Sequence, residues 1–125
     1  MTYEEEFKYW IDSCFQQTIP NSVVAFSFNL FEVAETNDVK FGIEMVGTAS
    51  FDEDDSDWAC DEVWEPEVRQ TPIPKQFSGD DWEECLINVK FLLQSYIESH
   101  SSTEKFKQGV GIGFVDGELE VLWQP

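Results

Sequence analysis

Two stretches of the chain carry apolar residues at the three- and four-residue spacing of an amphipathic helix. The first covers residues 2–17, where Thr2 and Glu5 fit a capping box, and it ends before Pro20. The second covers residues 80–99, with Asp80 as the expected N-cap. Its apolar stripe consists of Trp82, Leu86, Val89, Leu93, Tyr96 and Ile97. These segments predict the two main helices of the fold.

Other stretches alternate with a period of two, which predicts strands. Residues 24–31 and 39–45 flank a polar turn and predict an antiparallel hairpin with one apolar face. Residues 110–115 and 118–123 predict a second hairpin, because Asp116-Gly117 favours a type I′ turn. Gly109, Gly111 and Gly113 leave one face of the first of these two strands without side chains, so another part of the chain can approach it closely.

The middle of the chain is less regular. Residues 52–57 are expected to form a loop and residues 58–64 a short edge strand. Residues 65–76 contain three prolines and are expected to form an extended connector without regular structure. The whole pattern predicts an α+β fold, with an antiparallel sheet of about four to six strands and two main helices packed on one face. The length of 125 residues fits a single globular domain over residues 1–125.

The chain is strongly acidic, with a net charge of −19 from 26 acidic and 7 basic residues. Charge of this sign repels nucleic acid and anionic membranes, so neither is expected as a partner. It also opposes self-association, so we expect a monomer when the protein is free. A basic protein surface would be attracted and its encounter accelerated. Many small cytoplasmic proteins are acidic as well, and a rigid array of carboxylates can also mimic DNA phosphates, so charge alone does not identify the partner.

Cysteine usage and the start of the chain bear on the compartment. Cys14, Cys60 and Cys85 are odd in number and far apart, so a disulfide framework is not expected. Glutamates occupy positions 4–6, where a signal peptide needs basic residues. No apolar run reaches the roughly 18 residues that a membrane span requires. We therefore expect a cytoplasmic protein.

The densest charge lies between Thr48 and Trp64, in the stretch TASFDEDDSDWACDEVW, which we call the acidic segment. Large rings at Phe51, Trp58 and Trp64 are interspersed with seven carboxylates. The carboxylates belong to Asp52, Glu53, Asp54, Asp55, Asp57, Asp61 and Glu62. A solvated tail gains nothing from tryptophan, whereas a folded surface can hold an acidic patch beside an aromatic anchor. We expect these carboxylates and Trp58 to bind a basic partner, with Trp64 in the core and Trp58 nearer the rim.

Other chemistries fit this sequence less well. An EF-hand loop starting at Asp52 would place Asp57 at the glycine position and Val63 at the bidentate glutamate position, so no metal or other cofactor is expected. His100 is the only histidine, and no cysteine is marked as a nucleophile beside it. Acid–base work by a carboxylate pair such as Asp54/Asp55 or Asp61/Glu62 needs one of the two desolvated, but we expect both pairs to be solvated. The alternatives are a small enzyme that uses clustered carboxylates with a divalent metal, or an acidic adaptor.

Four strings occur together in this chain. They are FSFNLFE at 26–32, GIEMVGTASFDEDDSDWACDEVW at 42–64, DDWEE at 80–84 and GVGIGFVDGELEVLW at 109–123. With them the chain resembles small acidic bacterial immunity proteins, which are encoded beside polymorphic or contact-dependent growth inhibition toxins. The resemblance implies an inhibitor and not an enzyme. It would bind the C-terminal domain of its cognate toxin, often a nuclease with a basic cleft, and we expect the acidic segment to occlude that cleft.

Overall fold

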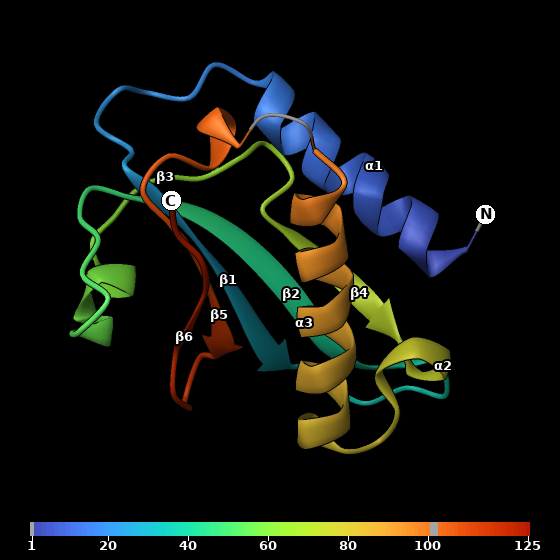
Figure 1. Cartoon of the computed structure of the whole chain (residues 1–125). Helices are drawn as coiled ribbons and strands as arrows, with labels where there is room; N and C mark the ends of the chain where they lie inside the picture. Colours follow the sequence, from blue (N-terminus) through green and yellow to red (C-terminus); the bar gives the residue numbers. More distant parts are fainter. Residues whose placement is uncertain (1, 101–102) are drawn as a thin grey trace.

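The capping box predicted at the start of the chain is present in the computed structural model, which describes residues 2–100 and 103–125 (Figure 1). Thr2 Oγ1 accepts a hydrogen bond from the backbone N–H of Glu5, and helix α1 spans Tyr3–Gln16. Helix α3 spans Trp82–Glu98. Its N-cap is Asp81 and not the predicted Asp80, because Asp81 Oδ1 accepts from the N–H of Glu83. Both main helices are thus confirmed, with ends shifted by one or two residues.

The two predicted hairpins belong to one six-stranded sheet. Strands β1 (Ala25–Glu32) and β2 (Val39–Thr48) pair antiparallel, as do β5 (Val110–Phe114) and β6 (Glu120–Trp123). The strand order is β3-β2-β1-β5-β6, and β4 also pairs with β2. Strands β1 and β5 run parallel, and this pairing joins the two hairpins. The predicted α+β class is confirmed, with a mostly antiparallel sheet.

The connection of the second hairpin differs from the predicted type I′ turn. That turn needs positive φ at Asp116 and Gly117. Among the described residues, only Gly79 and Lys107 have positive φ. The N–H of Gly117 donates to the carbonyl of Phe114 at 3.0 Å, so the turn is centred on Val115 and Asp116. Strand β6 begins only at residue 120, which makes the connection longer than two residues.

Two segments are more regular than their sequence predicted. Residues Ser56–Cys60 form the short 3₁₀ helix η1, so the predicted strand over residues 58–64 shrinks to β3 (Glu62–Trp64). The expected connector contains β4 (Gln70–Pro74) and the beginning of the four-residue helix α2 (Lys75–Ser78). Prolines are tolerated in β4 because it pairs only with β2 and forms a sheet edge. A second 3₁₀ helix, η2, spans Glu104–Phe106.

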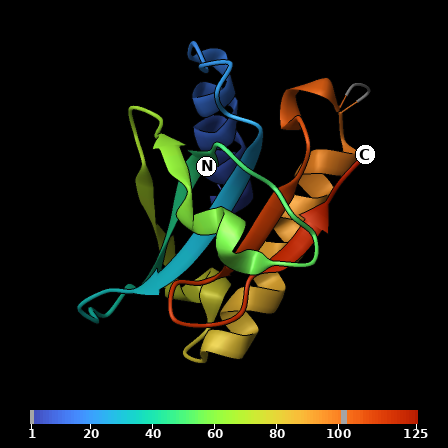
Figure 2. The same cartoon turned by 90° about the vertical axis from the view of Figure 1, so that its left-hand side faces the viewer.

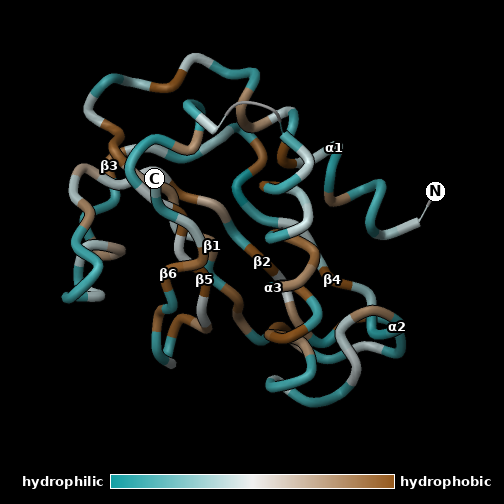
Figure 3. The backbone as a smooth tube through the Cα atoms, in the orientation of Figure 1, coloured by the Kyte–Doolittle hydropathy of each residue, from teal (hydrophilic) through white to brown (hydrophobic). Residues whose placement is uncertain are grey.

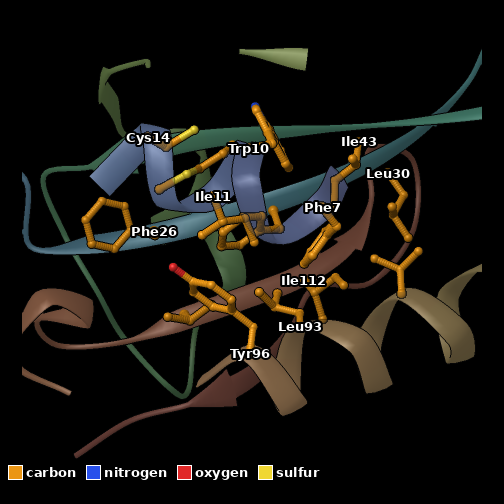
Figure 4. Close-up of a cluster of buried hydrophobic side chains, with 14 of the residues drawn as sticks. Phe7, Trp10, Ile11, Cys14, Phe26, Leu30, Ile43, Leu93, Tyr96 and Ile112 are labelled. Carbon is orange, nitrogen blue, oxygen red and sulfur yellow. The ribbon is translucent and has the colours of Figure 1, made fainter. Parts of the chain in front are cut away.

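The hydrophobic core lies between one face of the sheet and the helices α1 and α3 (Figure 4). Helix α1 supplies Phe7 and Ile11, and α3 supplies Leu93. The strands supply alternate residues, Phe26, Phe28 and Leu30 in β1, Phe41, Ile43 and Met45 in β2, and Val110 and Ile112 in β5. Figure 3 shows hydrophobic residues along these central strands and hydrophilic ones along the outer turns. No helix within residues 2–100 and 103–125 is long and apolar enough to cross a lipid bilayer.

Candidate functional site

The acidic segment runs across strand β5, on the sheet face turned away from the helices (Figure 2). On this face β5 presents only Gly111 and Gly113, because its other residues point into the core. A Cβ atom at Gly111 would lie 2.8 Å from Trp58 Cζ2, and one at Gly109 would lie 2.3 Å from Phe51 Cε1. The strand face without side chains is therefore where the rings of Phe51 and Trp58 pack. The rings also contact each other edge to face, with centroids 5.0 Å apart.

Backbone hydrogen bonds close the acidic segment into a compact loop. The N–H of Ala49 donates to the carbonyl of Asp61 at 2.9 Å, and the N–H of Asp61 donates to the carbonyl of Trp58 at 3.1 Å. Within the loop, Asp52 Oδ1 accepts from the N–H of Asp54 and Asp55 Oδ1 from the N–H of Asp57. A loop whose ends meet and whose own side chains fill it keeps a defined shape, as compact Ω-type loops do.

All seven carboxylates of the acidic segment are exposed: Asp52, Glu53, Asp54, Asp55, Asp57, Asp61 and Glu62. Only Glu62 forms a salt bridge, with Arg69, in the part of the chain that the structure describes. Glu53 accepts a hydrogen bond from the amide of Gln124, which is neutral. Six negative charges are thus displayed on a fixed loop without an internal cation. The structure brings the predicted carboxylates together as one exposed surface.

The two tryptophans of the segment have the opposite placement to the one predicted. Trp58 is buried, with 4% of its surface exposed, whereas Trp64 is only partly buried. The expectation of Trp58 at the rim was wrong because the glycines of β5 make room for its ring, a feature about 50 residues away in the sequence. Trp64 packs edge to face on Phe26 at the border of the core. Trp58 therefore holds the loop on the sheet and does not offer an exposed contact.

Arg69 is a site residue that the sequence did not reveal. Its guanidinium bonds Glu44 on β2 at 3.2 Å, Glu62 on β3 at 2.6 Å, and Glu65. These bonds, above all the one to Glu62, raise the pKa of Arg69. Burial opposes the ionisation of Glu44, but hydrogen bonds from Asn29 and Arg69 outweigh it and hold the pKa of this carboxyl below its usual value. Arg69 thereby links three segments at the sheet edge. Of the seven carboxylates of the acidic segment, it pairs only with Glu62.

His100 lies just after the C-terminal end of α3, which fits the predicted helix over residues 80–99. Its Nδ1 is 2.7 Å from the carbonyl oxygen of Tyr96, so Nδ1 carries the proton. Its Nε2 is 2.9 Å from Lys105 Nζ, which also donates to the Tyr96 hydroxyl. That hydroxyl donates to Asp12 at 2.6 Å. Burial lowers the pKa of Lys105, with Asp12 opposing the shift.

This network packs helix α3 against α1 and η2. No cysteine bonds His100 among the described residues. Cys14 and Cys85 are buried, whereas Cys60 is exposed. Within residues 2–100 and 103–125, no three His, Cys, Asp or Glu side chains are grouped so that they could hold a metal ion.

Comparisons of the chain with models of protein families, with curated proteins and with solved structures gave no match. Function is therefore inferred from the chain's own charge and geometry.

Proposed function

We propose that this chain is an immunity protein, a non-enzymatic inhibitor that binds the C-terminal domain of a cognate growth inhibition toxin in the cytoplasm. The observation that supports it is the set of exposed carboxylates in the acidic segment, six of which have no ion-pair partner within residues 2–100 and 103–125. A catalytic site would need some of these groups desolvated, and all are exposed. A binding surface for a basic protein needs them accessible and fixed in place.

The mechanism is occlusion of a basic active site, with a nuclease as the expected toxin. Phe51 and Trp58 fix the loop before the partner arrives, so little conformational entropy is lost on binding. The carboxylates then take the places of the phosphates in a cleft lined by Lys and Arg. Glu62 contributes less than the others because Arg69 already neutralises it. Long-range attraction speeds the encounter, and salt weakens it over a Debye length of about 8 Å.

The identifying experiment is a pull-down from the native host with this protein as bait, washed at low and then at moderate salt. Recovery of one basic toxin domain, partly released by salt, is the expected result. Recovery of no basic protein, together with a tight divalent-metal site in calorimetry, would favour a small metalloenzyme.

Association kinetics with the recovered domain test the role of the loop. Replacing Asp54, Asp55 and Asp57 together by Asn removes three charges, and Asn keeps the side-chain oxygen that accepts the local backbone hydrogen bonds. We expect association to slow by about tenfold at low salt and the difference to shrink at high salt. The matched control replaces Glu4, Glu6 and Glu98 by Gln, which removes the same charge from the first turn of α1 and the last turn of α3. Equal slowing in both variants would show that net charge acts without this loop.

A further inference from the structure

The most exposed tryptophan among the described residues is Trp82, and it borders a pocket outside the acidic segment. The sequence placed this residue in the core stripe of its helix. In the structure it is the first residue of α3 and 52% of its surface is exposed. Its ring contacts Phe114 edge to face, with centroids 5.9 Å apart. The pocket has a volume of about 350 Å³ and is lined by Glu32, Trp82, Phe114, Val115, Asp116 and Gly117.

The lining combines aromatic surface with negative charge. Glu32 and Asp116 are both exposed, and neither forms a salt bridge within the described part of the chain. A cation beside them would meet two carboxylates and a half-exposed indole, a ring whose face attracts cations. The start of helix α3 carries a partial positive charge, but Asp81 caps it and Glu83 adds a negative charge in the first turn. A pocket of this composition favours a cation with a flat apolar surface.

Among protein side chains, arginine fits this description best. Its planar guanidinium stacks on aromatic rings and donates forked hydrogen bonds to carboxylates, whereas the lysine ammonium is compact and strongly hydrated. An anionic ligand would be repelled by the two carboxylates and by the net charge of −19. A second copy of this chain would be repelled by that same charge.

The pocket adjoins the acidic segment through the connection between β5 and β6. Val115, Asp116 and Gly117 of this connection line the pocket. Leu119, at its other end, lies against Gly111 beside the ring of Trp58. Figures 1 and 2 both show the connection between the acidic segment and the start of α3. A partner that covers the acidic segment can therefore reach the pocket as well.

We propose that this pocket binds an arginine side chain of the basic protein partner, as a second point of attachment beside the acidic segment. The identity of that partner rests on the proposed function, but the pocket's preference for arginine can be tested without it.

The first test is an NMR titration of the ¹⁵N-labelled protein with N-acetyl-arginine methylamide, and in parallel with its neutral analogue N-acetyl-citrulline methylamide. We expect saturable shifts at the Trp82 indole N–H and at the amides of Val115 and Gly117 with the arginine probe only. The Trp82→Leu variant should bind the probe at least about fivefold more weakly, and Glu32→Gln with Asp116→Asn about tenfold more weakly. Tyr9→Leu, which removes another exposed aromatic ring on α1, is the matched control and should change nothing.

Equal binding of citrulline, or shifts confined to the acidic segment, would overturn the pocket's role.

Dissociation of the recovered toxin domain gives the second test. Trp82→Leu should speed its dissociation about fivefold while leaving association nearly unchanged, since a short-range contact acts mainly after the encounter. An unchanged dissociation rate overturns the arginine contact and leaves the proposed function standing. If the arginine probe binds at the pocket but the pull-down recovers no toxin domain, the pocket's preference for arginine is supported and the proposed function fails.

Discussion

Replacing Gly111 by Ala tests whether the glycine face of β5 holds the acidic segment. The new Cβ would lie 2.8 Å from Trp58 Cζ2, 3.1 Å from Trp58 Cη2 and 3.3 Å from Leu119 Cδ2. Carbon atoms in contact prefer separations of about 3.5–4.0 Å. The indole cannot retreat freely, because Trp58 is buried and Phe51 packs against it. The substitution must therefore shift the ring, the loop or the strand.

The expected loss of stability follows from two opposing effects. Inserting a methyl group into a packed site costs about 1–3 kcal/mol. Replacing glycine by alanine also restricts the unfolded chain, which returns about 0.4–1 kcal/mol where the backbone conformation allows it, as at Gly111, whose φ is not positive. The net loss is about 1–2 kcal/mol. For a chain of this size that lowers the melting temperature by about 4–8 °C.

Urea unfolding followed by tryptophan fluorescence measures this change, with Gly117→Ala as the matched control. A Cβ at Gly117 meets only Phe114, at 3.6 Å, which is ordinary contact, so the control should be neutral or slightly stabilising. A double-mutant cycle with Trp58→Leu isolates the cause, because the penalty at Gly111 should shrink once the indole is gone. A Gly111→Ala variant as stable as the control, or a penalty unchanged by Trp58→Leu, would refute the seating of the ring on this glycine.

Two further predictions concern the sheet edge and the thiols. Arg69→Gln should cost about 1–3 kcal/mol, because Glu44 loses a charged partner while remaining largely buried. Because the pKa of Glu44 is lowered in the folded state, its ionised form stabilises the native protein above the unfolded pKa of about 4.3, and this stability is lost as the pH falls through the folded pKa. The Arg69→Gln variant lacks part of this contribution, so its free energy of unfolding should fall less than that of the native protein between pH 6 and pH 3. Burial raises the pKa of Cys14 to about 11 and that of Cys85 to about 12. Ellman's reagent should therefore titrate only Cys60 in the native protein and all three thiols in denaturant, and rapid reaction of a second native thiol would contradict this.

Elements defined by local pattern were predictable from the sequence. The capping residues Thr2 and Glu5, the helical stripes and the two hairpins all depend on neighbours within a few positions. The parallel pairing of β1 with β5 was not predictable, because alternation shows that a strand has two faces but does not say which strand lies beside it. The predicted type I′ turn at Asp116-Gly117 was wrong because the chain turns one residue earlier, at Val115 and Asp116, and β6 begins only at Glu120.

The candidate site divides in the same way. Clustered carboxylates at residues 52–62 are visible in the sequence, and their exposure follows from their charge. The burial of Trp58 depends on Gly111, which lies in a strand far away in the sequence. The sequence alone therefore could not show whether Trp58 contacts a partner or packs the loop against the sheet. For Trp82 the prediction was wrong in the opposite direction. Its helical spacing predicted burial, but as the first residue of α3 it has half of its surface exposed.

The distribution of the few basic residues explains how the chain tolerates its charge without weakening the proposed surface. Arg69 neutralises carboxylates at the sheet edge, Lys75 pairs with Glu35, and Lys90 pairs with Glu120. All of these pairs but the one with Glu62 lie outside the acidic segment. Among the described residues, Glu62 is the one carboxylate of that segment with an ion-pair partner, so repulsion among the other six is offset by the apolar contacts of Phe51 and Trp58. Apolar contacts do not screen charge. A loop held in this way keeps its full attraction for a basic partner, whereas a loop held by salt bridges would have lost most of it.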